Sequence, residues 1–273
     1  RWDWAKEMYD TARRLDFPFM AGSSVPLAQR RPPLELPTNT EIRSAVAIHG
    51  GGVESYDFHG LEVLQSMVEA RRGGETGVKD VRFLTADALW KAADEGLWST
   101  ELADAAMAAE LGPGLPPLRE LIAQKFPTTD SHGILITYAD GLRAIVLKVG
   151  NSATRWNCAC KVEGESTPAA TAFYVGPWQN RNLFKALSHA IQSMFLSGKV
   201  PYPVERTLLT TGVLDAAMVA RFRKGEATET PQLAIAYQPT DYRSMREMGD
   251  SWKIITEQVV EPKGLEPLVI PAH

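Results

Sequence analysis

The stretch of sequence that decides the fold runs from residue 134 to residue 149 and reads ILITYADGLRAIVLKV. Two runs of apolar and β-branched residues, Ile134–Tyr138 and Leu142–Val149, flank the dipeptide Asp140–Gly141. Such residues favour strands, and Asp-Gly supplies the positive φ values that a two-residue hairpin turn needs. The stretch therefore predicts an antiparallel hairpin.

Further strands and helices are expected on both sides of this hairpin. Apolar runs and alternations predict strands over 41–48, 78–84, 156–162, 170–175 and 233–237. Apolar residues at three- and four-residue spacing predict helices after the triglycine at 50–52, over 183–196 and from about 203 to 224. Residues 86–126 have a helical pattern that glycine and proline interrupt, which is typical of an insertion. The order of elements predicts an α/β (α+β) fold with a mainly antiparallel open sheet and helices on one face.

The first forty residues differ from the rest. Apolar residues recur at helical spacing from Trp2 to Leu15, and Phe17–Ala21 is a short apolar run that fits a buried strand. Because one helix and one strand cannot bury their own faces, we expect them to be the end of a Rossmann-like domain that begins upstream of Arg1. Repeated prolines over 26–37 predict an extended connection. The expected organisation is therefore 1–40, a larger domain over 41–240, and a tail over 241–273.

The composition excludes several classes of protein. The chain has 273 residues, of which 44% are hydrophobic, and a net charge of −4 without a long basic run, so we expect no nucleic-acid partner. Charged residues interrupt every apolar stretch before it reaches the roughly 18 residues that cross a bilayer, so we expect no membrane span. The two cysteines, Cys158 and Cys160, are too close along one strand to pair without strain, which predicts reduced thiols and a cytoplasmic protein.

Three segments carry a resemblance to a known family. FPFMAG at residues 17–22 and Arg-Arg-Pro at 30–32 are similar to the exit from a dinucleotide-binding domain. GGGVESYDFH at residues 50–59 is similar to a Gly-Gly segment that leads into a helix with the motif Asp-x-Gly-x-His. In this order the segments resemble the carboxy-terminal two-thirds of the Gfo/Idh/MocA family of nicotinamide-dependent sugar oxidoreductases.

The resemblance implies an activity, a cofactor and an assembly. It implies hydride transfer between NAD or NADP and a sugar or sugar-derived alcohol in the full-length protein. It also implies a homo-oligomer that associates through the sheet face left uncovered by helices. Two features depart from the family. Ser55 and Asp57 stand where the family has aspartate and glycine, and the sequence holds no G-x-G-x-x-G fingerprint. The family's catalytic lysine would precede Arg1.

Five residues are candidates for the site. The resemblance implies that His59 is the acid/base residue, and an imidazole is the side chain whose unperturbed pKa lies nearest neutral pH. Tyr56, Gln65 and Trp178 offer the aromatic faces and the planar amide that hold hydroxyl-rich ligands. Arg30 offers a cation to an anionic substrate or a cofactor phosphate. We expect His59 at the mouth of a cleft, close to residues 21 and 22.

Two alternatives remain open from the sequence. His49, Asp57, His59 and Glu62 are ligand types for zinc, but their spacing matches no strong metal motif, so we expect no metal. If the chain is complete as given, it would instead be a noncatalytic module for ligand binding or self-association.

Overall fold

The computed structural model describes residues 1–126, 131–177, 180–241 and 258. Its strands are β1 (Gln29–Arg31), β2 (Ile42–Gly50), β3 (Val78–Thr85), β4 (His132–Tyr138), β5 (Arg143–Lys148), β6 (Ser152–Val162), β7 (Ala169–Tyr174) and β8 (Thr228–Glu229). Its α-helices are α1 (Trp2–Leu15), α2 (Ser55–Val68), α3 (Ala86–Asp94), α4 (Thr100–Leu111), α5 (Leu118–Lys125), α6 (Arg181–Ser197) and α7 (Glu205–Phe222). Short 3-10 helices span Val25–Leu27 and Pro231–Leu233.

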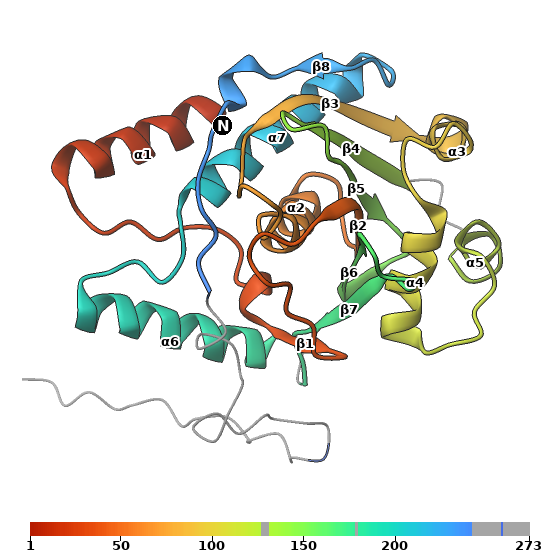
Figure 1. Ribbon diagram of the computed structural model, residues 1–273, viewed down its shortest axis with the longest axis horizontal. Helices are drawn as coiled ribbons and strands as arrows, with labels where there is room; N and C mark the ends of the chain where they lie inside the picture. Colours follow the sequence, from red (N-terminus) through yellow and green to blue (C-terminus); the bar gives the residue numbers. More distant parts are fainter. Residues whose placement is uncertain (127–130, 178–179, 242–257, 259–273) are drawn as a thin grey trace, which may run out of the picture.

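The strands form one eight-stranded sheet in the order β1-β7-β6-β2-β5-β4-β3-β8 (Figure 1). Among the described strands, only β2 and β5 pair in parallel, and the other neighbouring pairs are antiparallel. The mixed α/β fold with a mainly antiparallel sheet is therefore confirmed.

The predicted hairpin forms, with a different turn. Strands β4 and β5 pair antiparallel from His132–Lys148 to Thr137–Arg143. The N–H of Tyr138 donates to the carbonyl of Leu142 at 2.9 Å, so three residues, not two, lie between the closing pair. Gly141 has a φ of 90°, which a glycine adopts without strain. The prediction of a two-residue turn was wrong, because Asp140 does not have the positive φ that such a turn needs. Its carboxylate instead accepts the N–H of Leu142 at 3.1 Å.

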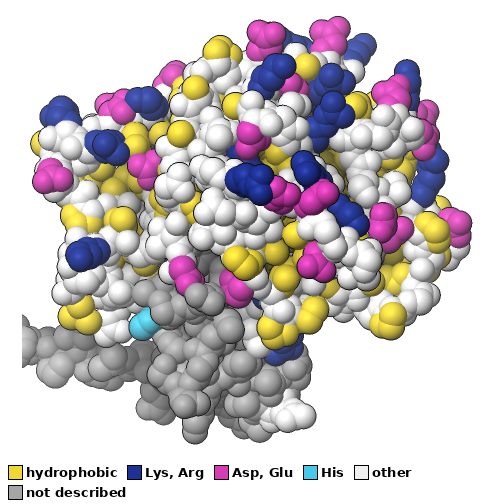
Figure 2. Space-filling model, in the orientation of Figure 1, with side chains coloured by type: hydrophobic (Ala, Val, Ile, Leu, Met, Phe, Trp, Pro, Cys, Tyr) yellow, Lys and Arg dark blue, Asp and Glu magenta, His cyan; other side chains and the backbone are white. Residues whose placement is uncertain are grey.

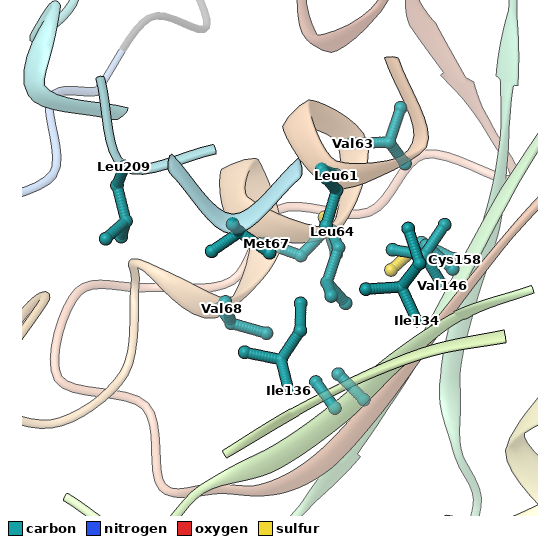
Figure 3. Close-up of a cluster of buried hydrophobic side chains, with 14 of the residues drawn as sticks. Leu61, Val63, Leu64, Met67, Val68, Ile134, Ile136, Val146, Cys158 and Leu209 are labelled. Atoms are coloured by element: carbon teal, nitrogen blue, oxygen red, sulfur yellow. The ribbon is translucent and has the colours of Figure 1, made fainter. Parts of the chain in front are cut away.

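One face of the sheet packs against α2 and α7. Figure 3 shows side chains of α2, such as Leu61, Leu64 and Val68, pointing toward Ile134 and Ile136 of β4. Further members of this core come from α7. The helix therefore lies over the middle of the sheet, with its amino-terminal end near the carboxyl ends of β2 and β5.

The second face is covered too, so the expectation of helices on one face was wrong. Helices α3, α4 and α5 pack on this face (Figure 1). The sequence indicated this second layer, because Ala45–Ile48 is a continuous apolar run of the kind that is buried on both faces of a sheet. Residues 86–126, interpreted as an insertion, provide this second layer. The uncovered face expected to carry a homo-oligomer is therefore covered.

The ends of the described chain differ from expectation. The helix at the amino end forms as α1, but Phe17–Ala21 is no strand, and Phe17 is 48% exposed. The proline-rich segment contains β1, which pairs with β7 as the edge of the sheet, because prolines are tolerated at sheet edges. The strand expected at 233–237 is instead a 3-10 turn followed by a single bridge between Glu75 and Tyr237.

Charged side chains of both signs lie at the surface, whereas the two cysteines are buried. Basic and acidic side chains are mixed over the face shown in Figure 2. No helix within the described ranges is both long enough and apolar enough to cross a membrane. Cys158 and Cys160 are buried and unbridged, and both project to the face of the sheet that α2 covers.

Candidate functional site

A row of polar and aromatic side chains crosses four strands at one end of the sheet. His132, Lys148, His49 and Trp156 are successive cross-strand partners on β4, β5, β2 and β6. The row lies at the carboxyl ends of the parallel strands β2 and β5, and α2 begins directly after β2. Ligands of open α/β sheets bind at the carboxyl ends of parallel strands. This end of the sheet is therefore the candidate site.

Asp57 joins this row to the first turn of α2. Its Oδ1 atom accepts hydrogen bonds from His49 Nε2 at 2.9 Å and from His132 Nε2 at 2.7 Å. Its Oδ2 atom accepts the backbone N–H of Glu54 at 2.6 Å, as part of a capping box. Burial by itself would raise the pKa of Asp57, but the hydrogen bonds from His132 and His49 outweigh it and hold this pKa well below its usual range. Asp57 is thus a buried carboxylate that accepts from two imidazoles.

His49, Asp57 and His132 are also close enough to hold a metal ion, since their ligand atoms lie within 4.8 Å of one another. The hydrogen bonds favour another reading. The backbone N–H of Gly51 donates to His49 Nδ1 at 3.3 Å, which places the proton of this imidazole on Nε2, where it donates to Asp57. A metal-ligating histidine instead leaves the ligating nitrogen bare and donates from the other one. The cluster is therefore better described as a hydrogen-bonded group that fixes the start of α2.

An aromatic group adjoins the cluster, in which Trp156 is buried and Tyr56 and His59 are half-buried. The rings of Tyr56 and Trp156 stack with their centroids 5.2 Å apart and an interplanar angle of 11°. The His59 ring meets Trp156 edge-on at 5.6 Å. The Tyr56 ring fits here because residue 51 is a glycine. A Cβ atom at this position would lie 1.9 Å from the ring. Aromatic faces of this kind hold apolar faces of ligands, whereas nearby polar atoms fix the ligand's orientation.

His59 is a half-buried residue of this site with a ring nitrogen left for a ligand. Its side chain is half-buried, and Nδ1 lies 2.7 Å from the hydroxyl of Ser23. Within the described part of the chain, Nε2 has no hydrogen-bond partner. Burial, and then the neighbouring His49, lower the pKa of His59, so the ring is neutral at pH 7 and can accept a proton. Its contact with Ser23 places it next to residues 21 and 22, as the sequence predicted.

The other predicted site residues lie elsewhere. Gln65 lies nearly two turns after His59 on α2. It accepts a hydrogen bond from Tyr138 at 2.8 Å and donates one to Tyr237 at 3.0 Å in a buried network. Arg30 is buried on β1, where its Nη1 donates to the carbonyl of Leu34 at 2.8 Å. Arg30 instead lines a cavity of about 350 Å³ beside the second half of α2. Trp178 lies outside the described residues.

Sequence reasoning missed three members of the site. His132 and Lys148 were not singled out, although the hairpin fixes their register, because pairing outward from Tyr138–Leu142 brings His132 opposite Lys148. Ser23 had no signal in the sequence pattern, since its contact with His59 joins residues 36 positions apart. Of the zinc-ligand types considered, Glu62 turns away from the row and accepts from Thr210 at 2.6 Å.

Residues 50–57 do not fit the pyrophosphate of a dinucleotide cofactor. The loop of Gly50, Gly51 and Gly52 joins a strand to a helix, but its glycines admit protein atoms, namely the Tyr56 ring at Gly51 and the backbone of Ser152 at Gly50. The first turn of the helix carries the Asp57 carboxylate, which would repel a pyrophosphate. We therefore derive no step through a cofactor on these residues.

Comparisons with known proteins agree with this fold. No protein-family model and no curated protein matches the sequence. Myo-inositol dehydrogenase from Lactobacillus casei, solved with NAD(H) and myo-inositol, aligns with a TM-score of 0.50 and 13% identity over 89% of this chain and 70% of its own.

Two other structures give weaker alignments. Levoglucosan dehydrogenase, in complex with NADH and L-sorbose, aligns with a TM-score of 0.45 and 12% identity over 85% of this chain and 71% of its own. GenD2 from gentamicin A biosynthesis, in complex with NAD, aligns with a TM-score of 0.43 and 11% identity over 70% of this chain. The chain spans only 56% of the length of GenD2. The likeness to myo-inositol dehydrogenase shows that the chain shares its fold with the aligned part of that protein.

Proposed function

We propose that this chain is the substrate-binding part of a Gfo/Idh/MocA-type oxidoreductase. Its reaction would interconvert an alcohol carbon of a sugar or sugar-derived polyol and the corresponding carbonyl, with NAD or NADP held by residues other than those described. The observation that carries the proposal is His59, whose Nε2 atom has no hydrogen-bond partner within the described chain and whose ring lies beside Tyr56 and Trp156. The fold shared with myo-inositol dehydrogenase supports the substrate class.

The residues of this chain account for the hydroxyl proton. In the oxidation direction, a substrate hydroxyl within hydrogen-bond reach of His59 Nε2 gives its proton to that nitrogen, and the return reaction takes it back. The lowered pKa of His59 keeps the ring neutral, and hence able to act as a base, at pH 7. Tyr56, which is half-buried and is backed by the buried Trp156, would contact the apolar face of the ring of a cyclic polyol.

The test measures formation of reduced nicotinamide by the native protein that contains this chain, with NAD and NADP supplied separately and with a panel of cyclic polyols and sugars. His59→Asn should lower turnover by roughly two to four orders of magnitude, because it removes the group that takes the proton. The matched control is His189→Asn on α6, which should leave turnover unchanged. Near-normal turnover in the His59→Asn protein would contradict the proposal.

A second candidate is a noncatalytic ligand-binding module. The poor fit of residues 50–57 to a pyrophosphate favours it, since hydride transfer needs a cofactor. The same assay separates the two candidates. A module of this kind would bind polyols at the Tyr56–Trp156 stack but would form no reduced nicotinamide with any of them.

Two further expectations complete the proposal. We place the protein in the cytoplasm, where its two buried, unbridged cysteines would stay reduced. A homo-oligomer remains a prediction, and light scattering at micromolar concentration tests it. Because helices cover both faces of the sheet, the surface first expected to carry this association no longer supports it.

A further inference from the structure

Ser23 is the protein group that holds the His59 ring. It belongs to the segment between α1 and β1, and its side chain is only 3% exposed. Its Oγ atom lies 2.7 Å from His59 Nδ1 and accepts the backbone N–H of Val25 at 3.1 Å. A serine hydroxyl has one hydrogen to donate and two lone pairs. After the bond from Val25, one hydrogen and one lone pair remain for the imidazole.

The backbone around Ser23 is fixed by α2 and α7. The N–H of Ser23 donates to Glu62 Oε2 at 3.4 Å, and Thr207 donates to the carbonyl of Ala21 at 3.1 Å. Gly22 has a φ of 111°, and a Cβ atom there would lie 2.2 Å from Thr207 Oγ1 and 2.8 Å from Glu62 Oε2. Only glycine fits both this conformation and this space. The position of the Ser23 hydroxyl, and with it the orientation of the His59 ring, is therefore set by the fold.

We propose that Ser23 is the positioning residue of His59 and that its hydroxyl holds the ring in both protonation states. For Nε2 to accept a proton, the neutral ring must carry its hydrogen on Nδ1, so the Ser23 oxygen accepts from Nδ1 both before and after Nε2 is protonated. In the other tautomer, in which Nδ1 is bare and Nε2 already carries the hydrogen, the hydroxyl donates to Nδ1 instead. A carboxylate in this place would only accept, and its charge would favour the protonated ring. Because serine is neutral, Nε2 can alternate between bare and protonated forms without a large change in ring position. This inference rests on the proposed function of His59.

The effect of removing the hydroxyl follows from this geometry. In a Ser23→Ala protein the ring loses its one hydrogen-bond partner within the described chain, so both its rotation and its choice of protonated nitrogen become free. We expect turnover to fall about tenfold to a hundredfold, less than for His59→Asn, because the base remains but spends less time in the productive orientation. Substrate KM should change little, since Ser23 does not reach the ligand.

The experiment compares native protein with its Ser23→Ala and Ser23→Thr variants, labelled with 15N on the histidine rings. Nitrogen chemical shifts report which ring nitrogen carries the proton, and steady-state kinetics give turnover and KM. We expect Ser23→Ala to change the His59 tautomer populations and to lower turnover, and Ser23→Thr, which keeps the hydroxyl, to restore most of both. Circular dichroism checks that each variant folds, and Ser23→Cys, with its weak donor, replaces any variant that does not.

The outcomes separate this inference from the proposed function. If His59→Asn retains near-normal turnover, the proposed function fails, while the nitrogen shifts still test the contact with Ser23. If His59→Asn loses turnover but Ser23→Ala changes neither the tautomer populations nor the turnover, the positioning role of Ser23 is overturned.

Discussion

The two ends of α2 carry two buried polar clusters that differ in one respect. At the carboxyl-terminal end, Gln65 and Glu69 join a network with Arg206 and Tyr237, and these side chains bond to one another. At the amino-terminal end, Asp57 is as fully paired, but the neighbouring His59 has one ring nitrogen without a partner in the described chain. The comparison teaches that burial and polarity do not mark a site by themselves. The feature that sets the amino-terminal end apart is the ring nitrogen of His59 that has no hydrogen-bond partner within the described chain.

The carboxyl-terminal cluster links distant parts of the chain. Arg206 of α7 makes two contacts with Glu69, at 2.9 Å and 2.6 Å, and the Tyr237 hydroxyl donates to Glu69 at 2.9 Å. Arg71 pairs with Glu75 at 2.8 Å and with Asp140 of the hairpin loop at 2.6 Å. This cluster fixes α2 against α7, the hairpin and the segment that follows the 3-10 helix Pro231–Leu233.

The largest expected effect breaks this structural cluster. Arg206→Met removes the cation from a buried pair and leaves Glu69 charged and unneutralised, which should lower the free energy of unfolding by about 3–5 kcal/mol. Urea unfolding at pH 7 measures it. The control is Arg13→Met, because Arg13 is exposed and its ion pair with Glu205 is screened by solvent, so the loss should be much smaller than for Arg206→Met. Equal small losses for both variants would show that the cluster does not anchor α2.

The second prediction acts on the other end of the helix. Gly51→Ala places a Cβ atom on the Tyr56 ring, which should cost about 1–3 kcal/mol of stability and displace Tyr56 from Trp156. Affinity for a cyclic polyol should fall about tenfold, measured by calorimetry. Gly52→Ala is the matched control, because its nearest atom would be Ser55 Oγ at 3.7 Å, an ordinary contact. Unchanged affinity in the Gly51→Ala protein would show that the stack does not contact ligand.

The third prediction concerns the loss of stability at acidic pH that is linked to His49. Burial lowers the pKa of His49 in the folded protein below its ordinary 6.5, so its contribution to stability is complete above pH 6.5 and is lost as the pH falls toward the folded value. His49→Gln should therefore weaken the decline of the unfolding free energy as the pH falls below 6.5. Thermal melts from pH 7 to pH 5 measure it, with His189→Gln as the control. An identical pH slope in the His49→Gln protein would contradict the burial of a neutral imidazole.

The smallest expected effect has the opposite sign. Burial raises the pKa of Glu62 in the folded protein, so stability linked to this group is greatest below pH 4.5 and decreases as the pH rises through the folded value. Glu62→Gln should then stabilise the protein at pH 8 by up to about 1 kcal/mol and have little effect at pH 4. The control is Glu163→Gln at an exposed position. A destabilised Glu62→Gln protein at pH 8 would show that the charge is needed to hold residues 21–23.

The sequence predicted the fold wherever local chemistry determines it. The hairpin around Asp140–Gly141, the strands over 41–48 and 78–84, and the helix after the triglycine all form. Errors arose where a choice depended on distant packing. Phe17–Ala21 has the composition of a strand but no neighbouring strand to pair with, whereas β1 forms among prolines because β7 offers an edge.

The site was predicted in part for the same reason. His59 and Tyr56 share one turn of a helix, so helical spacing was enough to group them. Lys148 and His132 join them only through strand pairing, and Ser23 only through the path of the chain after α1. Gln65 was assigned to the site because it lies on the same helix, but it bonds to Tyr138 and Tyr237 instead.

The most direct test of the difference between the two ends of α2 is a titration of this chain with myo-inositol, followed through the histidine ring resonances. The account predicts a saturable shift of the His59 nitrogen signals, larger at Nε2 than at Nδ1, while the signals of His189 on α6 stay unchanged. Unchanged His59 signals at millimolar polyol, or shifts confined to the residues around Gln65 and Tyr237, would contradict it.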